Sequence, residues 1–369
     1  MIAAQFEVLI IAVLSAIACA IPGVFLVLKR NSLMSDAISH SVLLGIVLMF
    51  LWVRDLYSPW LFIGAVSSGL MTVFLVELII GTRRVKVDAA IGLVFPLFFA
   101  IGVILINIYT RDIHLDADMV LLGDIALAPL DRFYWNGIDF GPRAVWVMAG
   151  VGLLNIIFVG LFFKELSIMI FDAALATSLG LAPTVVYYML MTIVSVTAVA
   201  AFDVVGSILV VALMITPAAT AYLMTKRLSI MVIYSVMVAI ASAIAGYGLA
   251  MWADASVPGA IATINGVIFL AVFLFVPKRG VVAKLISHRK QRLLFSLNMV
   301  LVQCYDHEGT PQESTENTLR NLVTHMGWTD RFSRQVVRLG VQENMLRING
   351  QRLFLTDLGR VSVKELLVR

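Results

Sequence analysis

Long apolar stretches separated by short polar connections fill roughly the first three quarters of this chain. A hydrocarbon core about 30 Å thick is crossed by roughly 20 helical residues, so each apolar stretch of that length predicts a membrane-spanning helix. Such stretches lie at residues 7–28, 33–53, 60–80, 89–108, 144–163, 184–202, 204–225, 229–252 and 258–276. We therefore expect an all-α polytopic transmembrane domain of about nine helices over residues 1–276.

The pattern changes at Pro277, where polar residues begin to separate short apolar groups. Residues 277–292 contain six Lys or Arg and no acidic residue, which suits a juxtamembrane linker lying against anionic lipid headgroups. In residues 293–369 apolar residues recur at helical spacing, and Asn349-Gly350 separates two short alternating runs, which is a hairpin signal. Two helices, a hairpin and a final LTDLGR turn resemble the winged-helix fold of metal-dependent and related bacterial repressors. The resemblance predicts a small α+β domain over residues 293–369.

Three arginines bear on the partner of this small domain. Arg331, Arg334 and Arg338 would line one face of its second helix, as a DNA-reading helix requires. However, residues 293–369 contain nine basic and eight acidic side chains, a net charge of +1, which makes a poor phosphate binder. A solvated face on a protein-protein module is therefore the preferred interpretation, and DNA is not expected as a partner.

Composition agrees with membrane insertion. The chain is 61% hydrophobic and 14% charged, with a mean hydropathy of +0.98, whereas ordinary soluble domains are about 25% charged. Two cysteines, one in an apolar span and one in the tail, form no CxxC motif and indicate no redox chemistry.

The distribution of Lys and Arg among the short connections predicts the orientation, because cytoplasmic loops retain positive charge. One alternate set of connections is the more basic, with Lys29, Arg30, Arg83, Arg84, Lys86, Lys164, Lys226 and Arg227. It also leads into the basic linker. We expect the N-terminus outside the membrane and the C-terminus inside.

Asp36 and His40 are the main candidates for intramembrane chemistry. An ionisable group within the bilayer costs about 2.5–3.5 kcal/mol on insertion scales, so such groups are functional candidates. Their i, i+4 spacing places a carboxylate and an imidazole on one helical face, which suits a first-row divalent metal. The spacing also fits a structural role, with Asp36 capping the helix at the interface and His40 packing as a hydrogen-bonded residue. Spacing alone leaves both interpretations open.

A second, weaker candidate lies in the connection after the fourth predicted span. His114, Asp116 and Asp118 alternate there, and alternating hard ligands can gather a cation. An acidic, solvated external loop explains the same residues and is the preferred interpretation.

Five runs carry a resemblance to a known family: RNSLMSDAISHSVLLG, HLDADMVLLGDIAL, KELSIMIFDAALATSLGL, VVGSILVVALMITPAATA and VPGAIATING. In this collinear order, over residues 1–276, the chain resembles the permease family of ABC importers for manganese, zinc and iron. The resemblance implies that Asp36 and His40 contact the transported metal. It also implies a second permease subunit, identical or paralogous, an extracellular or periplasmic metal-binding protein and a separate cytoplasmic ATPase.

Residues 164–182 resemble the family's coupling helix, which docks onto the ATPase. The charge bias places this segment inside, and it is amphipathic and too short to span the membrane. Phe171, Asp172, Leu175 and Gly180 are the residues expected to form the docking segment.

The chain contains no GxxxxGK[ST] phosphate loop, so ATP hydrolysis is expected in another chain, and this chain is not expected to be an enzyme. No resident cofactor is expected, because the metal is cargo. The sequence thus predicts a multi-pass permease of a bacterial plasma or inner membrane. Two alternatives stay open: an ion-coupled secondary metal carrier, and a membrane-tethered regulator whose tail reads DNA.

Overall fold

The structure is a computed structural model that describes residues 2–55, 58–109, 125–135, 138–277 and 280–368. It divides into two compact units, Met1–Val276 and Pro277–Arg369, which are described separately. The division falls where the hydropathy pattern of the sequence changes.

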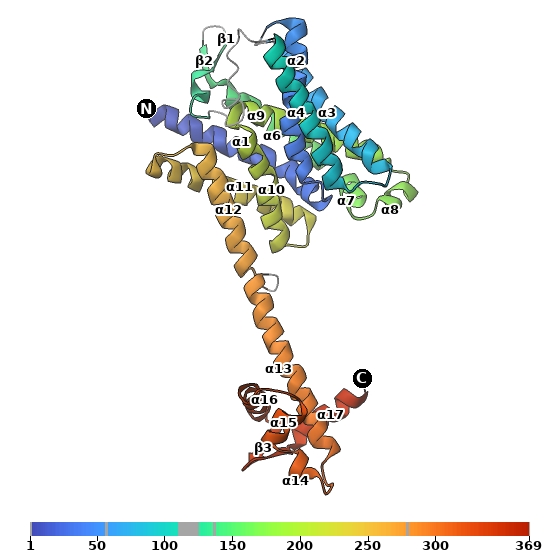
Figure 1. Ribbon diagram of the computed structural model, residues 1–369. Helices are drawn as coiled ribbons and strands as arrows, with labels where there is room; N and C mark the ends of the chain where they lie inside the picture. Colours follow the sequence, from blue (N-terminus) through green and yellow to red (C-terminus); the bar gives the residue numbers. More distant parts are fainter. Residues whose placement is uncertain (1, 56–57, 110–124, 136–137, 278–279, 369) are drawn as a thin grey trace. The chain divides into compact units, whose positions relative to one another are not determined.

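The described part of the first unit contains nine helices that are long and apolar enough to span a membrane, which confirms the number of spans predicted (Figure 1). Their bounds lie within a few residues of those expected. The helices are α1 (Ile2–Leu28), α2 (Leu33–Val53), α3 (Pro59–Gly81), α4 (Val87–Tyr109), α6 (Arg143–Leu161), α9 (Pro183–Val205), α10 (Ser207–Met224), α11 (Leu228–Ala253) and α12 (Val257–Phe275).

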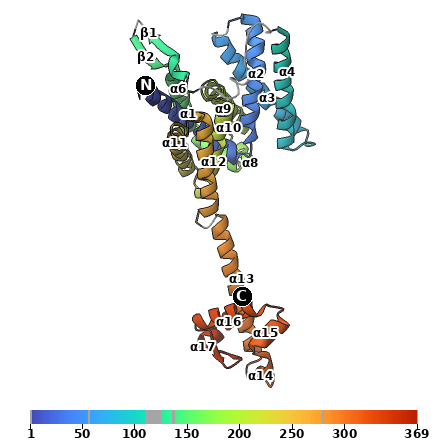
Figure 2. The same ribbon diagram turned by 60° about the vertical axis from the view of Figure 1, so that its left-hand side comes forward.

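Helix α1 lies at the centre of this unit and packs against α6, α9, α10 and α11. Lipid tails are as apolar as leucine, so helices associate in a bilayer through close packing of small residues rather than through the hydrophobic effect. A Cβ added at Gly23 of α1 would lie 1.9 Å from the backbone oxygen of Met214 on α10. The two backbones therefore touch at this glycine. A second group of neighbours, α2, α3 and α4, packs together in both views (Figures 1 and 2).

Buried amides join the helices by hydrogen bonds. The Nδ2 of Asn155 on α6 donates to the backbone oxygen of Ala18 at 2.8 Å and to Thr197 Oγ1 at 3.0 Å. Asn265 on α12 donates in the same way to the backbone oxygen of Ala212 at 2.9 Å. Interhelical bonds of this kind contribute about 0.6–2 kcal/mol each, so they add to the packing without dominating it.

The connection between α4 and α6 contains the 3-10 turn η1 (Ala128–Leu130) and an antiparallel hairpin of β1 (Arg132–Trp135) and β2 (Ile138–Pro142). Arg132 holds this hairpin through its Nε, 2.6 Å from Asp139 Oδ2. The same guanidinium lies 3.3 Å from Glu7 Oε1 on α1. The hairpin is therefore fixed at the end of the bundle where α1 begins.

The second unit has its own core. Its elements are α13 (Val281–Asp306), α14 (Glu313–Glu316), α15 (Leu319–His325), α16 (Asp330–Gln342), β3 (Leu346–Asn349), β4 (Arg352–Leu355) and α17 (Asp357–Val368). Helix α13 runs through residue 292, so the boundary expected there between linker and domain lies within one continuous helix. The core includes Leu301 of α13, Val336 of α16, Leu353 of β4 and Val363 of α17.

The predicted hairpin is present, and its register pairs Asn349 with Arg352. The two residues of the turn are therefore Gly350 and Gln351, one position later than the Asn-Gly signal indicated. Gly350 has a φ of +64°, a backbone conformation that glycine adopts without steric cost.

Substitution of Gly23 tests the close contact between α1 and α10. A methyl group in Gly23→Ala has no room beside the Met214 backbone, so the helices must separate, and overpacking typically costs about 1–3 kcal/mol. We expect a lower midpoint of thermal unfolding in detergent and less folded protein. Gly150→Ala on α6 is the matched control, because a Cβ there has no neighbour within 4 Å. Equal stability of the two variants would contradict the close contact.

Candidate functional site

The first candidate site is the pair formed by Asp36 and His40 on α2. Asp36 lies in the first turn of the helix, and His40 Nε2 lies 3.4 Å from Asp36 Oδ1. The side chains are 36% and 26% exposed, whereas Ser35, Ala37 and Ser39 between and beside them are buried. The pair is therefore the partly exposed part of a mostly buried stretch of helix.

Two aromatic rings of α4 hold the imidazole. The ring of Phe95 stacks on His40 at 5.7 Å between centroids, and the ring of Phe99 meets it edge-on at 5.9 Å. Phe95 and Phe99 are four residues apart and so lie on one face of α4. These contacts restrict the imidazole to an orientation in which Nε2 points to Asp36. The sequence alone does not indicate these two phenylalanines, because nothing local marks α4 as the neighbour of α2.

A carboxylate oxygen and an imidazole nitrogen are suitable ligands for zinc or manganese. Within the described residues, no group of three or more His, Cys, Asp or Glu side chains lies together. The pair thus offers two ligands, whereas zinc takes four and octahedral ions take six. A metal bound there would need further ligands from beyond these two side chains.

A second cluster joins the start of α2 to α9. Asn31 Nδ2 donates to the hydroxyl of Tyr187 at 3.1 Å, and both residues are less than 10% exposed. Lys29 Nζ lies 5.6 Å from the centroid of the same tyrosine ring, and the tyrosine hydroxyl also bonds with Glu77 of α3. These contacts fix the connection between α1 and α2. This connection leads into the start of α2, the helix of Asp36 and His40. The sequence alone does not indicate these contacts, because Asn31 and Tyr187 are 156 positions apart.

The predicted coupling segment forms two short helices, α7 (Phe163–Phe171) and α8 (Ala173–Ser178). Asp172 joins them and caps α8, accepting hydrogen bonds from the backbone N–H groups of Ala174 at 3.0 Å and Leu175 at 2.9 Å. The cap satisfies two N–H groups that a helix start leaves without partners. The segment ends at Gly180, whose φ is +78°.

Apolar side chains project from this segment. Phe171 is 67% exposed and Leu175 is 48% exposed, while Leu166 and Met169 of α7 are buried and anchor the segment. A capped turn that displays large apolar side chains is suited to insertion into a partner's cleft. The third candidate set, His114, Asp116 and Asp118, lies outside the described residues.

Comparisons with known proteins agree with this architecture. The family model described as the ABC 3 transport family matches residues 1–276. The zinc transport system membrane protein TroD of Treponema pallidum is 46% identical over 356 residues, covering 96% of both chains. The manganese transport system membrane protein MntD of Bacillus subtilis is 44% identical over 282 residues, covering 76% of this chain and 95% of MntD. The match to TroD therefore extends into the second unit of this chain. The match to MntD covers nearly all of MntD but corresponds in extent to the first unit alone.

A solved structure supports the family assignment. PsaBC from Streptococcus pneumoniae, in complex with a Fab, is similar with a TM-score of 0.62 and 31% identity, covering 76% of this chain and 98% of that one. The matched share corresponds in extent to the first unit. The chain belongs to the ABC 3 transport family, as a multi-pass membrane permease that is not itself an ATPase.

Proposed function

We propose that this permease imports a divalent transition metal and that Asp36 and His40 contact the metal during transport. The distance of 3.4 Å between an imidazole nitrogen and a carboxylate oxygen, on a partly exposed face, is the observation that carries the proposal. The relatives support the class of cargo: TroD is named for zinc, MntD for manganese and YfeC of Yersinia pestis for chelated iron. Nitrogen and oxygen ligands suit ions of this group.

The two-ligand pair favours a paired permease. A second subunit, identical or paralogous, would bring an equivalent pair, and the four ligands together would satisfy zinc. Because Asp36 and His40 are partly exposed in the single chain, they remain accessible to such a partner. Transport then requires the partners of an ABC importer: an extracellular or periplasmic metal-binding protein and a cytoplasmic ATPase.

The proposed orientation has the N-terminus outside, from the positive charge of the alternate connections. It puts the α7–α8 segment inside, where it would dock onto the ATPase through Phe171 and Leu175. Asp172, which caps α8, and Gly180, at which the segment ends, would maintain the conformation of the segment. Family membership in an ABC transporter replaces the ion-coupled carrier considered from the sequence, since that mechanism uses no ATPase.

The second unit is proposed to be a winged-helix-like accessory domain attached through basic α13. Its helix pair and hairpin occur in the order expected for that fold, whereas the expected final turn at residues 355–360 is the start of helix α17. The family match ends at residue 276, so this unit adds a regulatory or assembly role to transport rather than a part of the transport pathway.

Substitution of the metal-contacting pair tests the main proposal. Asp36→Asn removes the charge and His40→Ala removes the imidazole, and we expect each to lower the initial rate of metal uptake at least about tenfold. The assay is isotope uptake into vesicles containing the complete complex. Asp88→Asn is the control, because Asp88 is an exposed acid in the first turn of α4. Uptake at the normal rate by both pair variants would exclude the pair from the pathway.

Removal of the aromatic contacts gives a second test. Phe95→Ala and Phe99→Ala should lower metal affinity by about 10-fold or more, since groups that orient a ligand typically contribute 10–100-fold. Isothermal titration of the purified permease with Zn²⁺ or Mn²⁺ measures this. Leu97→Ala is the control, because Leu97 is 53% exposed on the same helix. Unchanged affinity in both phenylalanine variants would show that the rings do not position His40.

A third test addresses the coupling segment. Phe171→Asp or Leu175→Asp should abolish stable binding of the ATPase, because a charge replaces an apolar anchor, while Phe171→Leu should retain it. Asp172→Ala should weaken binding and Asp172→Asn should preserve it, since Asn also caps helices. Co-purification and metal-dependent ATP hydrolysis are the measurements. Coupled turnover that survives both Asp substitutions would assign the segment another role.

A further inference from the structure

The hydroxyl group of Tyr187 joins three elements of the transmembrane unit. Asn31 Nδ2, in the connection between α1 and α2, donates to this hydroxyl at 3.1 Å. An amide NH₂ group can only donate, so the tyrosine oxygen is the acceptor, and its own proton is left for the carboxylate of Glu77 on α3, with which it bonds. Asn31 and Tyr187 are both less than 10% exposed. The hydroxyl is therefore a buried polar junction between the α1–α2 connection, α3 and α9.

Asn31 also takes part in the start of α2. Its backbone oxygen accepts a hydrogen bond from the Met34 N–H at 3.0 Å, whereas the N-cap residue Ser32 makes no side-chain cap. The preceding residue, Arg30, has a φ of +61°, a conformation that residues other than glycine hold only when their surroundings enforce it. The bond between Asn31 and Tyr187 supplies such a constraint. The position of the first turn of α2 therefore depends on Tyr187.

Asp36 and His40 follow this start directly. Asp36 lies five residues after Asn31, which is about 7.5 Å along a helix at 1.5 Å per residue. Helix α2 contains no proline and is continuous from Leu33 to Val53. A displacement of its first turn therefore carries Asp36 and His40 with it.

Tyr187 is also close in the chain to the α7–α8 segment. Helix α8 ends in a turn at Gly180, which is closed by a hydrogen bond from the Leu181 N–H to the Ala176 oxygen at 3.0 Å. Helix α9 begins three residues later at Pro183, and Tyr187 lies in its second turn. Helices α7 and α8 both contact α9 as well. A movement of the α7–α8 segment is therefore passed to Tyr187 without a flexible connection between them.

From these contacts we propose that the Asn31–Tyr187 hydrogen bond links the α7–α8 segment to Asp36 and His40, and that Tyr187 is a positioning residue for transport. When the ATPase displaces the segment, α9 shifts, and the tyrosine hydroxyl moves Asn31 and the start of α2 with it. The bond is suited to this role because it is buried, so that breaking it leaves two polar groups without partners. This inference rests on the proposed roles of the segment and of the pair, and it adds the residue that connects them.

Tyr187→Phe tests the link by removing a single oxygen atom. The ring and its contact with Lys29 remain. In vesicles that contain the complete complex, the number of metal ions imported per ATP hydrolysed should fall about tenfold, which is within the range that residues between two coupled sites contribute. Co-purification of the ATPase and the affinity of the purified permease for Zn²⁺ should stay close to wild type, because the docking side chains and the pair are unchanged.

Asn31→Ala removes the other partner of the bond and should lower the ratio of metal to ATP by a similar factor. The double variant Asn31→Ala, Tyr187→Phe should be no worse than either single variant, because the two residues act through one bond. Two reductions that multiply in the double variant would show that the residues act separately, and would overturn the link.

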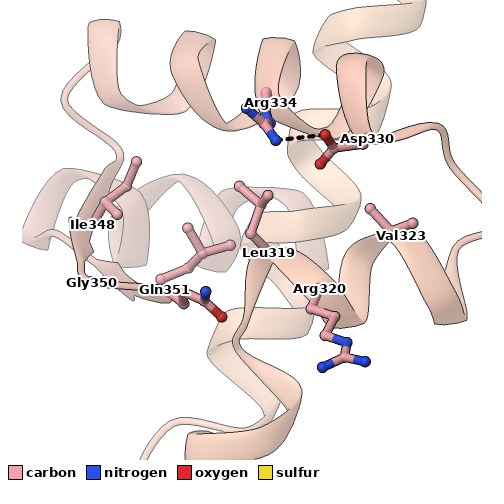
Figure 3. A pocket seen from close by; sticks show the side chains of 9 residues that line it. Leu319, Arg320, Val323, Asp330, Arg334, Ile348, Gly350 and Gln351 are labelled. Atoms are coloured by element: carbon pink, nitrogen blue, oxygen red, sulfur yellow. Dashed lines mark hydrogen bonds and ion pairs between the residues drawn. The ribbon is translucent and has the colours of Figure 1, made fainter.

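Two control variants remove comparable polar groups elsewhere. Tyr188→Phe removes the same atom from the next residue, whose ring meets that of Tyr187 edge-on at 5.7 Å. Asp330→Asn breaks an exposed contact of the second unit, the ion pair with Arg334 at 2.6 Å that Figure 3 shows. Exposed ion pairs contribute little to stability. Both controls should keep the wild-type ratio of metal to ATP.

Asp36→Asn, measured alongside, separates this inference from the transport proposal. If Asp36→Asn lowers import while Tyr187→Phe keeps the wild-type ratio, the link is overturned and the metal-contacting pair stands. If Asp36→Asn imports metal normally, the pair is excluded from the pathway and the link is overturned with it. Loss of ATPase binding or of Zn²⁺ binding in Tyr187→Phe would show that the hydroxyl maintains one of the two sites rather than connecting them, which also overturns the link.

Discussion

Backbone-to-backbone packing around α1 is the constraint on which the transmembrane unit depends. In a bilayer, helices gain no hydrophobic free energy by leaving lipid for each other, so contact must come from small residues and from interhelical hydrogen bonds. Gly23 lets α1 touch the backbone of α10, and Asn155 bonds α6 to α1 and α9. Helix α2, which carries Asp36 and His40, packs in turn against α9 and α10, two of the helices that surround α1.

The conformation of Asp36 and His40 on α2 depends on contacts with the neighbouring helices. Phe95 and Phe99 restrict the imidazole of His40, and the Asn31–Tyr187 bond fixes the connection from which α2 begins. Asp36 and His40 remain partly exposed, and the described residues place no third His, Cys, Asp or Glu beside them.

The sequence by itself determined the nine spans, because crossing a hydrocarbon core demands apolar stretches of a set length wherever they occur. It also put Asp36 and His40 on one face, since the helical period fixes which residues align, and it placed the hairpin within one residue of its turn. Only the tertiary structure decided that Phe95 and Phe99 hold His40 and that Tyr187 meets Asn31. These features depend on which elements become neighbours, and contacts between residues far apart along the chain leave no periodic pattern in either segment.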